Sequence, residues 1–195
     1  MDKRVAVFGG TFNPIHNGHV EIVRSVLSLP SISRVIVIPT ALPPHKAAKS
    51  LASGEQRMDM CRLALSEFSS VEISDIELTR GGKSYTYDTL CELKKSLTDR
   101  IALVCGGDMI TTFSGWYRFR DILKIADIIA LRRVGIDNSD FDKSVEELRA
   151  CGGNITVMDT KIDDISSSRV REGERLLIPA SVLEYINING LYEEE

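Results

Sequence analysis

The feature that most constrains the fold is a regular alternation along the chain. Short apolar runs rich in β-branched residues alternate with segments in which apolar residues recur at helical spacing. Nearly continuous apolar runs of this length are typical of parallel strands that are buried on both faces. Strands and helices in alternation form right-handed βαβ units. The sequence therefore predicts an α/β fold with a doubly wound, Rossmann-like parallel sheet and helices on both faces.

The predicted elements follow from this pattern. The strands are predicted at Val5–Phe8, Arg34–Ile38, Val71–Ile73, Ile101–Cys105, Asp127–Leu131 and Ile155–Met158. The helices are predicted at Gly18–Leu29, Glu55–Phe68, Tyr87–Leu97, Phe119–Ile125 and Phe141–Ala150, with shorter ones near Ser167–Glu174 and Ala180–Ile188. Ser53 and Gln56 have the spacing of a capping box, which supports a helix start there. No repeat or low-complexity tract interrupts the pattern, so residues 1–195 are predicted to form a single domain.

Charge and composition exclude several classes of function. A net charge of −4 argues against a sequence-wide basic surface for nucleic acid or anionic membranes. No apolar run approaches the roughly 20 residues that span a bilayer, and the amino terminus lacks the apolar stretch of a signal peptide. The four cysteines are scattered without a Cys-x-x-Cys pair, which argues against structural zinc or disulfides. We therefore expect a cytoplasmic protein with no nucleic-acid or membrane partner. The oligomeric state is left open, with a homo-oligomer as one alternative.

The stretch Gly-Gly-Thr-Phe-Asn-Pro-Ile-His-Asn-Gly-His, residues 9–19, follows the first predicted strand. In doubly wound sheets, ligands bind beyond the carboxyl ends of the strands, where the strand order reverses. Paired glycines permit a sharp turn there, and the amino end of the following helix favours anions. His16 and His19 can point the same way from that end. The pattern predicts a site where a polyphosphate undergoes nucleophilic attack. The structural alternative is one core histidine and one surface histidine near a turn.

The same stretch resembles the nucleotidylyltransferase superfamily, whose signature is His-x-Gly-His after the first strand. The longer form, Gly-Gly-Thr-Phe-Asp-Pro-x-His-x-Gly-His, narrows the resemblance to the bacterial nicotinate-nucleotide adenylyltransferase family. Asn13 stands where the family more often has Asp, and we expect little consequence because both residues favour turns. The resemblance implies that His16 and His19 are catalytic. It also implies that ATP is bound by Gly9, Gly10, Thr11, Phe12 and His19.

A second motif, Asp-Ile-Ser-Ser-Ser-Arg-Val-Arg-Glu at residues 164–172, resembles the family signature Ile-Ser-Ser-Thr-x-Ile-Arg. Serines can cap a helix whose N–H groups face phosphate oxygens. Arg171, one turn further along, offers a permanent bidentate charge for the β- and γ-phosphates, and we predict that it is catalytic. Ser166, Ser167, Ser168 and Arg171 are therefore predicted to bind ATP. Taken alone, this stretch would indicate an ordinary serine-capped surface helix.

Two further segments resemble those that bind the second substrate of the family, nicotinate mononucleotide. Pro-Pro-His-Lys, residues 43–46, implies a role for Lys46 in substrate binding, although its composition also fits a solvated loop. Ser-Tyr-Thr-Tyr-Asp-Thr, residues 84–89, opens a predicted helix behind two glycines. The resemblance implies that the backbone N–H of Thr86 recognises the carboxylate of the pyridine ring.

The segment that follows the fourth predicted strand, residues 106–119, completes the resemblance. Gly106 and Asp108 match a Gly-x-Asp pattern, and an acidic residue at a strand end can hold ribose hydroxyls. Trp116 offers a face for a pyridine ring, although a lone tryptophan is often a core residue. Tyr117 is predicted to supply a second amide for the carboxylate. The carboxyl-terminal stretch, residues 176–192, is predicted to contribute packing only.

Together these motifs imply adenylyl transfer, in which ATP and nicotinate mononucleotide give deamido-NAD and pyrophosphate in NAD biosynthesis. The acceptor phosphate is already ionised at neutral pH, so no general base is needed. Mg²⁺ is expected to bind through the ATP phosphates rather than in a cage of protein ligands. Other readings stay open: transfer to phosphopantetheine or nicotinamide mononucleotide, cytidylyl transfer, a nucleotide-binding regulator without turnover, or an interaction module without ATP affinity.

Overall fold

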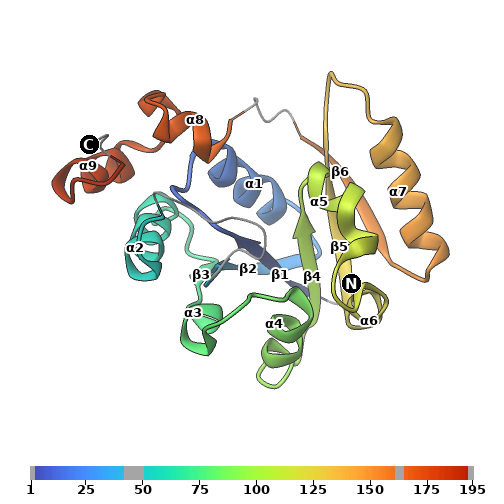
Figure 1. Cartoon of the computed structure of the whole chain (residues 1–195). Coiled ribbons are helices and arrows are strands. Elements are labelled where there is room, and N and C mark those ends of the chain that lie inside the picture. Colours follow the sequence, from blue (N-terminus) through green and yellow to red (C-terminus); the bar gives the residue numbers. More distant parts are fainter. Residues whose placement is uncertain (1–2, 42–50, 161–164, 193–195) are drawn as a thin grey trace.

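The computed structural model describes residues 3–41, 51–160 and 165–192. Within these ranges a parallel sheet has the strand order β3-β2-β1-β4-β5-β6 (Figure 1). Its strands are β1 (Arg4–Gly10), β2 (Ile32–Pro39), β3 (Val71–Ile73), β4 (Arg100–Cys105), β5 (Ala126–Arg133) and β6 (Ile155–Thr160). The predicted doubly wound sheet is confirmed.

Helices cover both faces of this sheet. The α-helices are α1 (Asn17–Leu27), α2 (Gly54–Ala64), α3 (Ile76–Arg80), α4 (Thr86–Leu93), α5 (Gly107–Thr112), α6 (Phe119–Ile125), α7 (Ser139–Ala150), α8 (Ser167–Arg171) and α9 (Ala180–Ile188). Two 3₁₀ turns, η1 (Phe113–Gly115) and η2 (Arg175–Leu177), accompany them. In Figure 1, α1 and α8 lie above the sheet and α4 lies below it.

Two apolar cores explain why the strands read as continuous apolar runs. In β1, Ala6 and Phe8 face one core, whereas Val5 and Val7 face the other. The first core also takes buried residues from α1, α2 and α9, and the second takes them from α4, α5, α6 and α7. Because side chains alternate between the two faces of a strand, both sets must be apolar when both faces are covered.

The predicted strands are all present, and the helices differ mainly at their ends. The helix predicted to reach Glu174 ends at Arg171, because Gly173 adopts a φ of +107° that breaks the helical path. The short helices α3 and α5 were not predicted. A helix of five or six residues covers less than two turns, so no apolar period can be read from it.

The topology predicts that a ligand binds beyond the carboxyl ends of the strands. From β1 the chain proceeds outward to β2 and β3, and it then returns to β4 on the other side of β1. The strand order therefore reverses between β1 and β4, which end at Gly10 and Cys105. Crevices at such reversals, beyond the carboxyl ends of the strands, are where open α/β sheets bind ligands.

The amino ends of three strands are held by an ion cluster around one buried carboxylate. Asp127, at the start of β5, has a side chain that is only 3% exposed. Its carboxylate accepts hydrogen bonds from Arg4 Nη1 at 3.2 Å and from Arg100 Nε at 2.8 Å. These residues stand at the amino ends of β1, β4 and β5, so a single carboxylate fixes the relative placement of three strands away from the ligand edge.

Asp127→Asn should lower the free energy of unfolding without changing turnover. The amide keeps the shape but loses the charge that two guanidinium groups share, and disruption of such a buried charged group costs about 1–3 kcal/mol. Chemical denaturation measures this loss. Asp159→Asn is the matched control, because Asp159 pairs with Arg132 on the surface and its replacement should change stability little. Equal stability of Asp127→Asn and the wild type would contradict this role.

Candidate active site

The loop from β1 to α1 places both motif histidines at the amino end of α1. His16 is the N-cap residue of this helix, and His19 lies in its first turn. Their rings stack with centroids 3.6 Å apart and an interplanar angle of 24°. The His16 backbone N–H donates to His19 Nδ1 at 3.2 Å. The sequence spacing thus brings two imidazoles together at a helix terminus, which is a setting that favours anions.

The hydrogen bond to His19 fixes the proton on its ring. Because Nδ1 accepts, the neutral imidazole carries its hydrogen on Nε2 and can donate from there. Burial lowers the pKa of His16 to about 4 and also holds the pKa of His19 well below its ordinary value. Both rings are therefore neutral at neutral pH. His16 Nδ1 is buried without a hydrogen-bond partner among the described residues.

The glycines before the loop have different roles. A Cβ at Gly10 would lie 2.8 Å from the Phe12 ring, so this position must lack a side chain. A Cβ at Gly9 or at Gly106 would meet no atom within 4 Å. These two glycines stand at the ends of the adjacent strands β1 and β4, and the open space beside them lets a ligand approach the backbone.

Phe12 differs from the other residues of the loop because its side chain belongs to the core. It is 2% exposed and packs edge-on against the rings of Phe8 and His19. Any contact of Phe12 with ATP must therefore be made by its backbone. The carbonyl of Thr11, the preceding residue, accepts a hydrogen bond from Arg57 of α2.

Helix α8 contacts the same loop from the other end of the sequence. Ser166 caps this helix by accepting from the Arg169 N–H at 3.3 Å. Ser167 Oγ donates to the Pro14 carbonyl at 2.9 Å. Arg171 donates from Nη1 to the Asn13 carbonyl at 2.6 Å and from Nη2 to Ser168 Oγ at 3.2 Å. The two motifs that the resemblance assigns to ATP therefore form one hydrogen-bonded unit.

Several residues of this unit were missed by the sequence analysis. Asn13 is 4% exposed, and its Oδ1 accepts from the Ala52 N–H at 3.0 Å and from the Tyr192 hydroxyl at 2.5 Å. The carboxyl-terminal stretch therefore does more than pack, because Tyr192 bonds directly to the loop. Arg57 of α2 donates from Nη1 to the Thr11 carbonyl at 2.8 Å. Arg57 stands three and four positions before the apolar residues Met60 and Cys61, and this spacing on one helix face was a hint that it is buried.

The residues predicted for the second substrate lie on two neighbouring elements. Tyr85 is the N-cap of α4, so Thr86 begins that helix with its amide free of the intrahelical pattern. The rings of Tyr85 and Tyr117 lie 4.9 Å apart, which brings the start of α4 next to the segment after η1. Thr86 and Tyr117 are therefore close to one another. Lys46 lies outside the described residues, as does His45.

Trp116 and Asp108 flank this region from the β4 side. Trp116 is half-buried and stacks on Phe113 with centroids 4.8 Å apart. One face of its indole is therefore occupied by Phe113. Asp108 lies exposed in the first turn of α5, two residues after Gly106. Within the described part of the chain, no three His, Cys, Asp or Glu side chains are grouped to hold a metal ion.

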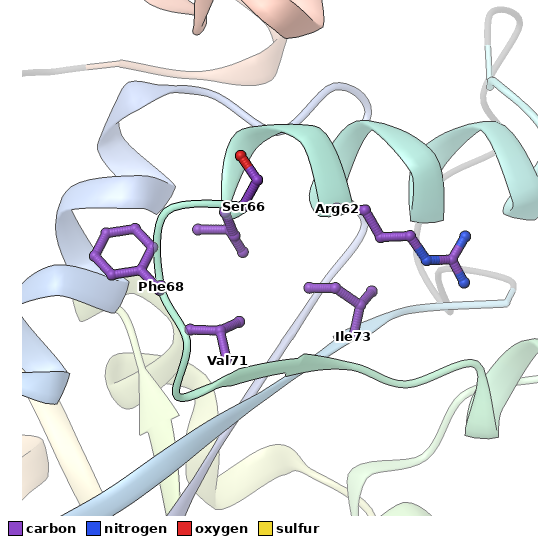
Figure 2. A pocket seen from close by; sticks show the side chains of 6 residues that line it. Arg62, Ser66, Phe68, Val71 and Ile73 are labelled. Atoms are coloured by element: carbon purple, nitrogen blue, oxygen red, sulfur yellow. The ribbon is translucent and has the colours of Figure 1, made fainter.

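A separate hollow lies between the end of α2 and the edge strand β3. It has a volume of about 280 Å³ and is lined by Arg62, Leu65, Ser66, Phe68, Val71 and Ile73. Figure 2 shows Phe68, Val71 and Ile73 around this hollow, while Arg62 extends away from it. It shares no residue with either motif and lacks converging polar groups, so it is not the candidate active site.

Comparison with known proteins assigns the family. Residues 7–173 match a family model described as cytidylyltransferase-like. A protein of Carboxydothermus hydrogenoformans named "probable nicotinate-nucleotide adenylyltransferase" is 36% identical over 197 residues, covering 97% of this chain and 98% of the relative. The chain belongs to the nicotinate-nucleotide adenylyltransferase family. A relative of the same name from Geobacter sp. (strain M21) is 34% identical over 211 residues, with coverage of 97% and 98%.

A solved structure supports the fold of this family member. The structure is described as Plasmodium falciparum nicotinic acid mononucleotide adenylyltransferase complexed with NaAD. It matches with a TM-score of 0.79 at 21% identity and covers 97% of both chains. At this identity the likeness confirms the doubly wound fold. Among the described helices, none is long and apolar enough to cross a membrane.

The buried histidines predict how stability depends on pH. The pKa of His16 is about 4 in the folded state, against an ordinary value of 6.5. Between these pH values the unfolded chain binds a proton that the folded protein does not, so stability falls as the pH drops from about 6.5 to 4. The loss from His16 is about 3 kcal/mol, and His19 acts in the same direction.

Chemical denaturation between about pH 7 and pH 4 measures this loss. His16→Asn is the informative variant, because asparagine keeps a residue suited to the N-cap but does not titrate. Its stability should fall less steeply with acid than that of the wild type. Parallel pH profiles for the two proteins would show that His16 is not buried in its neutral form.

Proposed function

We propose that this chain transfers the adenylyl group of ATP to nicotinate mononucleotide, giving deamido-NAD and pyrophosphate. The single observation that carries the proposal is the pair of neutral histidines at the start of α1, joined through the loop to Arg171 of α8. The names of the relatives agree with this activity.

The transfer is a direct displacement at phosphorus. A phosphate oxygen of nicotinate mononucleotide attacks the α-phosphorus of ATP, and the bond from that phosphorus to the bridging oxygen of pyrophosphate breaks. The attacking oxygen is already ionised, so no proton has to be removed from it. Catalysis then consists of holding two anions in line and stabilising the charge that develops on the transferring group and the leaving group.

The two histidines act as hydrogen-bond donors to this developing charge. His19 Nε2–H is held in place because Nδ1 is occupied by the His16 backbone. His16 is neutral and its ring lies against that of His19, so both rings reach the same region. A preorganised donor in a site that excludes water stabilises a transition state without any cost of reorganisation.

The remaining ATP contacts come from the loop and from α8. Gly9, Gly10, Thr11 and Phe12 offer backbone to the nucleotide, and Ser166, Ser167, Ser168 and Arg171 serve the leaving pyrophosphate. Arg171 spends one nitrogen on the loop and keeps further donors, since a guanidinium has five N–H groups. Mg²⁺ bound with ATP would neutralise charge on the phosphates. Neutral imidazoles and a guanidinium are not the oxygen ligands that Mg²⁺ prefers, so the ion binds through ATP.

The acceptor site discriminates by charge. The Thr86 amide at the start of α4 and the Tyr117 amide donate to the pyridine carboxylate, while Trp116 stacks on the ring. Gly106 and Asp108 hold the ribose, and Lys46 contributes to the binding of nicotinate mononucleotide. Free cysteines throughout the described chain fit a reducing compartment, and we place the reaction in the cytoplasm.

His19→Ala should lower kcat much more than it raises the KM for ATP. Loss of one donor to transition-state charge costs about 10²–10³-fold in kcat. Steady-state assays of pyrophosphate release measure both constants. Glu21→Ala is the control on the same helix, because Glu21 is exposed and away from the loop. A wild-type kcat in folded His19→Ala protein would remove His19 from the mechanism.

Nicotinate mononucleotide should be preferred over nicotinamide mononucleotide. A carboxylate accepts from both amides, whereas the NH₂ of an amide would face a donor and leave it unpaired. Such unpaired groups can discriminate by about 10⁴-fold in kcat/KM. Assays with a panel of acceptors, including phosphopantetheine, measure the preference. Trp116→Ala should weaken the binding of both mononucleotides and leave the ratio of their kcat/KM values unchanged, because stacking on the ring does not depend on the carboxylate. Similar kcat/KM values for the two would contradict the assigned acceptor.

A further inference from the structure

Arg57 is a buried cation without an anionic partner. It is 1% exposed within α2, and no ion pair among the described residues includes it. Its guanidinium is satisfied by carbonyl groups instead: Nε donates to Ala52 O at 3.1 Å, and Nη1 donates to Thr11 O at 2.8 Å. A charge in the interior is costly unless it is well bonded. A stability role alone would be met equally well by an apolar residue, so the contact with Thr11 calls for a functional explanation.

The bond to the Thr11 carbonyl sets the direction of the next N–H group. The Thr11–Phe12 peptide is trans, because the cis bond of this loop lies between Asn13 and Pro14. In a trans peptide the C=O and N–H point in opposite directions. With its carbonyl drawn toward Arg57 and the protein interior, this peptide turns the Phe12 N–H away from the interior. That N–H donates to no atom of the described residues.

The same peptide is held in a strained conformation. Phe12 has a φ of +48°, in the left-handed region that residues with a side chain avoid. Rotation of the Thr11–Phe12 peptide would bring Phe12 to a negative φ, and it would also turn the N–H inward. Packing of the Phe12 ring on Phe8 and His19 fixes the side chain but not this peptide. The charge-assisted bond from Arg57 is the interaction that opposes the rotation.

We propose that Arg57 is a positioning residue for ATP, which holds the Thr11–Phe12 peptide so that the Phe12 N–H donates to a phosphate oxygen. The inference rests on the proposed function for the identity of the nucleotide. Arg57 touches neither substrate; it acts through the backbone of the loop. Ala52, whose carbonyl accepts from Arg57, also donates its own N–H to Asn13, so the segment that bonds Arg57 contacts the loop directly as well.

The experiment compares Arg57→Met and Arg57→Lys with the control Arg62→Met. Methionine fills much of the buried space without hydrogen bonding, and lysine keeps the charge but offers a single donor nitrogen. Arg62 lies on the same helix, but it is exposed and bonds to Asp59. We expect Arg57→Met to raise the KM for ATP about tenfold or more. This change corresponds to the loss of one charge-assisted hydrogen bond, from the Phe12 N–H to a phosphate oxygen. The KM for nicotinate mononucleotide should stay within about twofold. Arg57→Lys should recover part of the loss, and Arg62→Met should match the wild type.

A second readout follows the Phe12 amide itself. In the ¹H–¹⁵N spectrum of the wild type, ATP alone should move the Phe12 amide signal downfield, and this shift should be lost in Arg57→Met and reduced in Arg57→Lys. Should Arg57→Met fail to fold, Arg57→Lys carries the test by both readouts. A wild-type KM for ATP in a folded Arg57 variant, or a Phe12 amide that ATP leaves unmoved in the wild type, would overturn the inference. Absence of turnover with nicotinate mononucleotide in the wild type would instead refute the proposed function, because the amide shift needs only ATP.

Discussion

The site depends on which groups donate hydrogen bonds to the carbonyls of one short loop. Between β1 and α1, the carbonyls of Thr11, Asn13 and Pro14 are bonded by Arg57, Arg171 and Ser167 respectively. Each donor comes from outside the loop, from α2 or α8. A loop that closed its own turn hydrogen bonds would direct its N–H groups inward. Here external side chains take the carbonyls, which frees backbone donors for an anionic ligand.

This arrangement also explains why distant parts of the chain matter to the site. Arg171 is separated from Asn13 by 158 positions in the sequence, and Tyr192 reaches the same residue from beyond α9. The parallel sheet makes this closure possible, because every strand ends at the same edge and successive helices start there. The Asp127 cluster holds the amino ends of three strands, so the carboxyl edge can carry open glycines and a strained residue without loss of register.

Sequence alone predicts the parts of this structure that repeat or that match a motif. The four inner strands were found because both of their faces are buried, and the histidine pair was found because its spacing is local. The Asn13 substitution was judged from turn preference, whereas its buried Oδ1 in fact joins Ala52 to Tyr192. Arg57 and Tyr192 act through contacts with residues far away in the sequence, and no period or spacing records such contacts. The short helices α3 and α5 were not predicted for a different reason: they are too short to show an apolar period.

The low pKa values of the histidines have a consequence for catalysis. With no ligand bound, neutral imidazoles can be buried at the helix terminus without the cost of desolvating a charge. In the proposed reaction, the negative charge of a triphosphate placed against them would raise the pKa of both rings back toward its ordinary value, because nearby negative charge favours the protonated form. Negative charge on the leaving pyrophosphate grows along the reaction, so the proton affinity of the pair grows with it. The proposed site is therefore stable when empty, and we expect its donors to strengthen as the displacement proceeds.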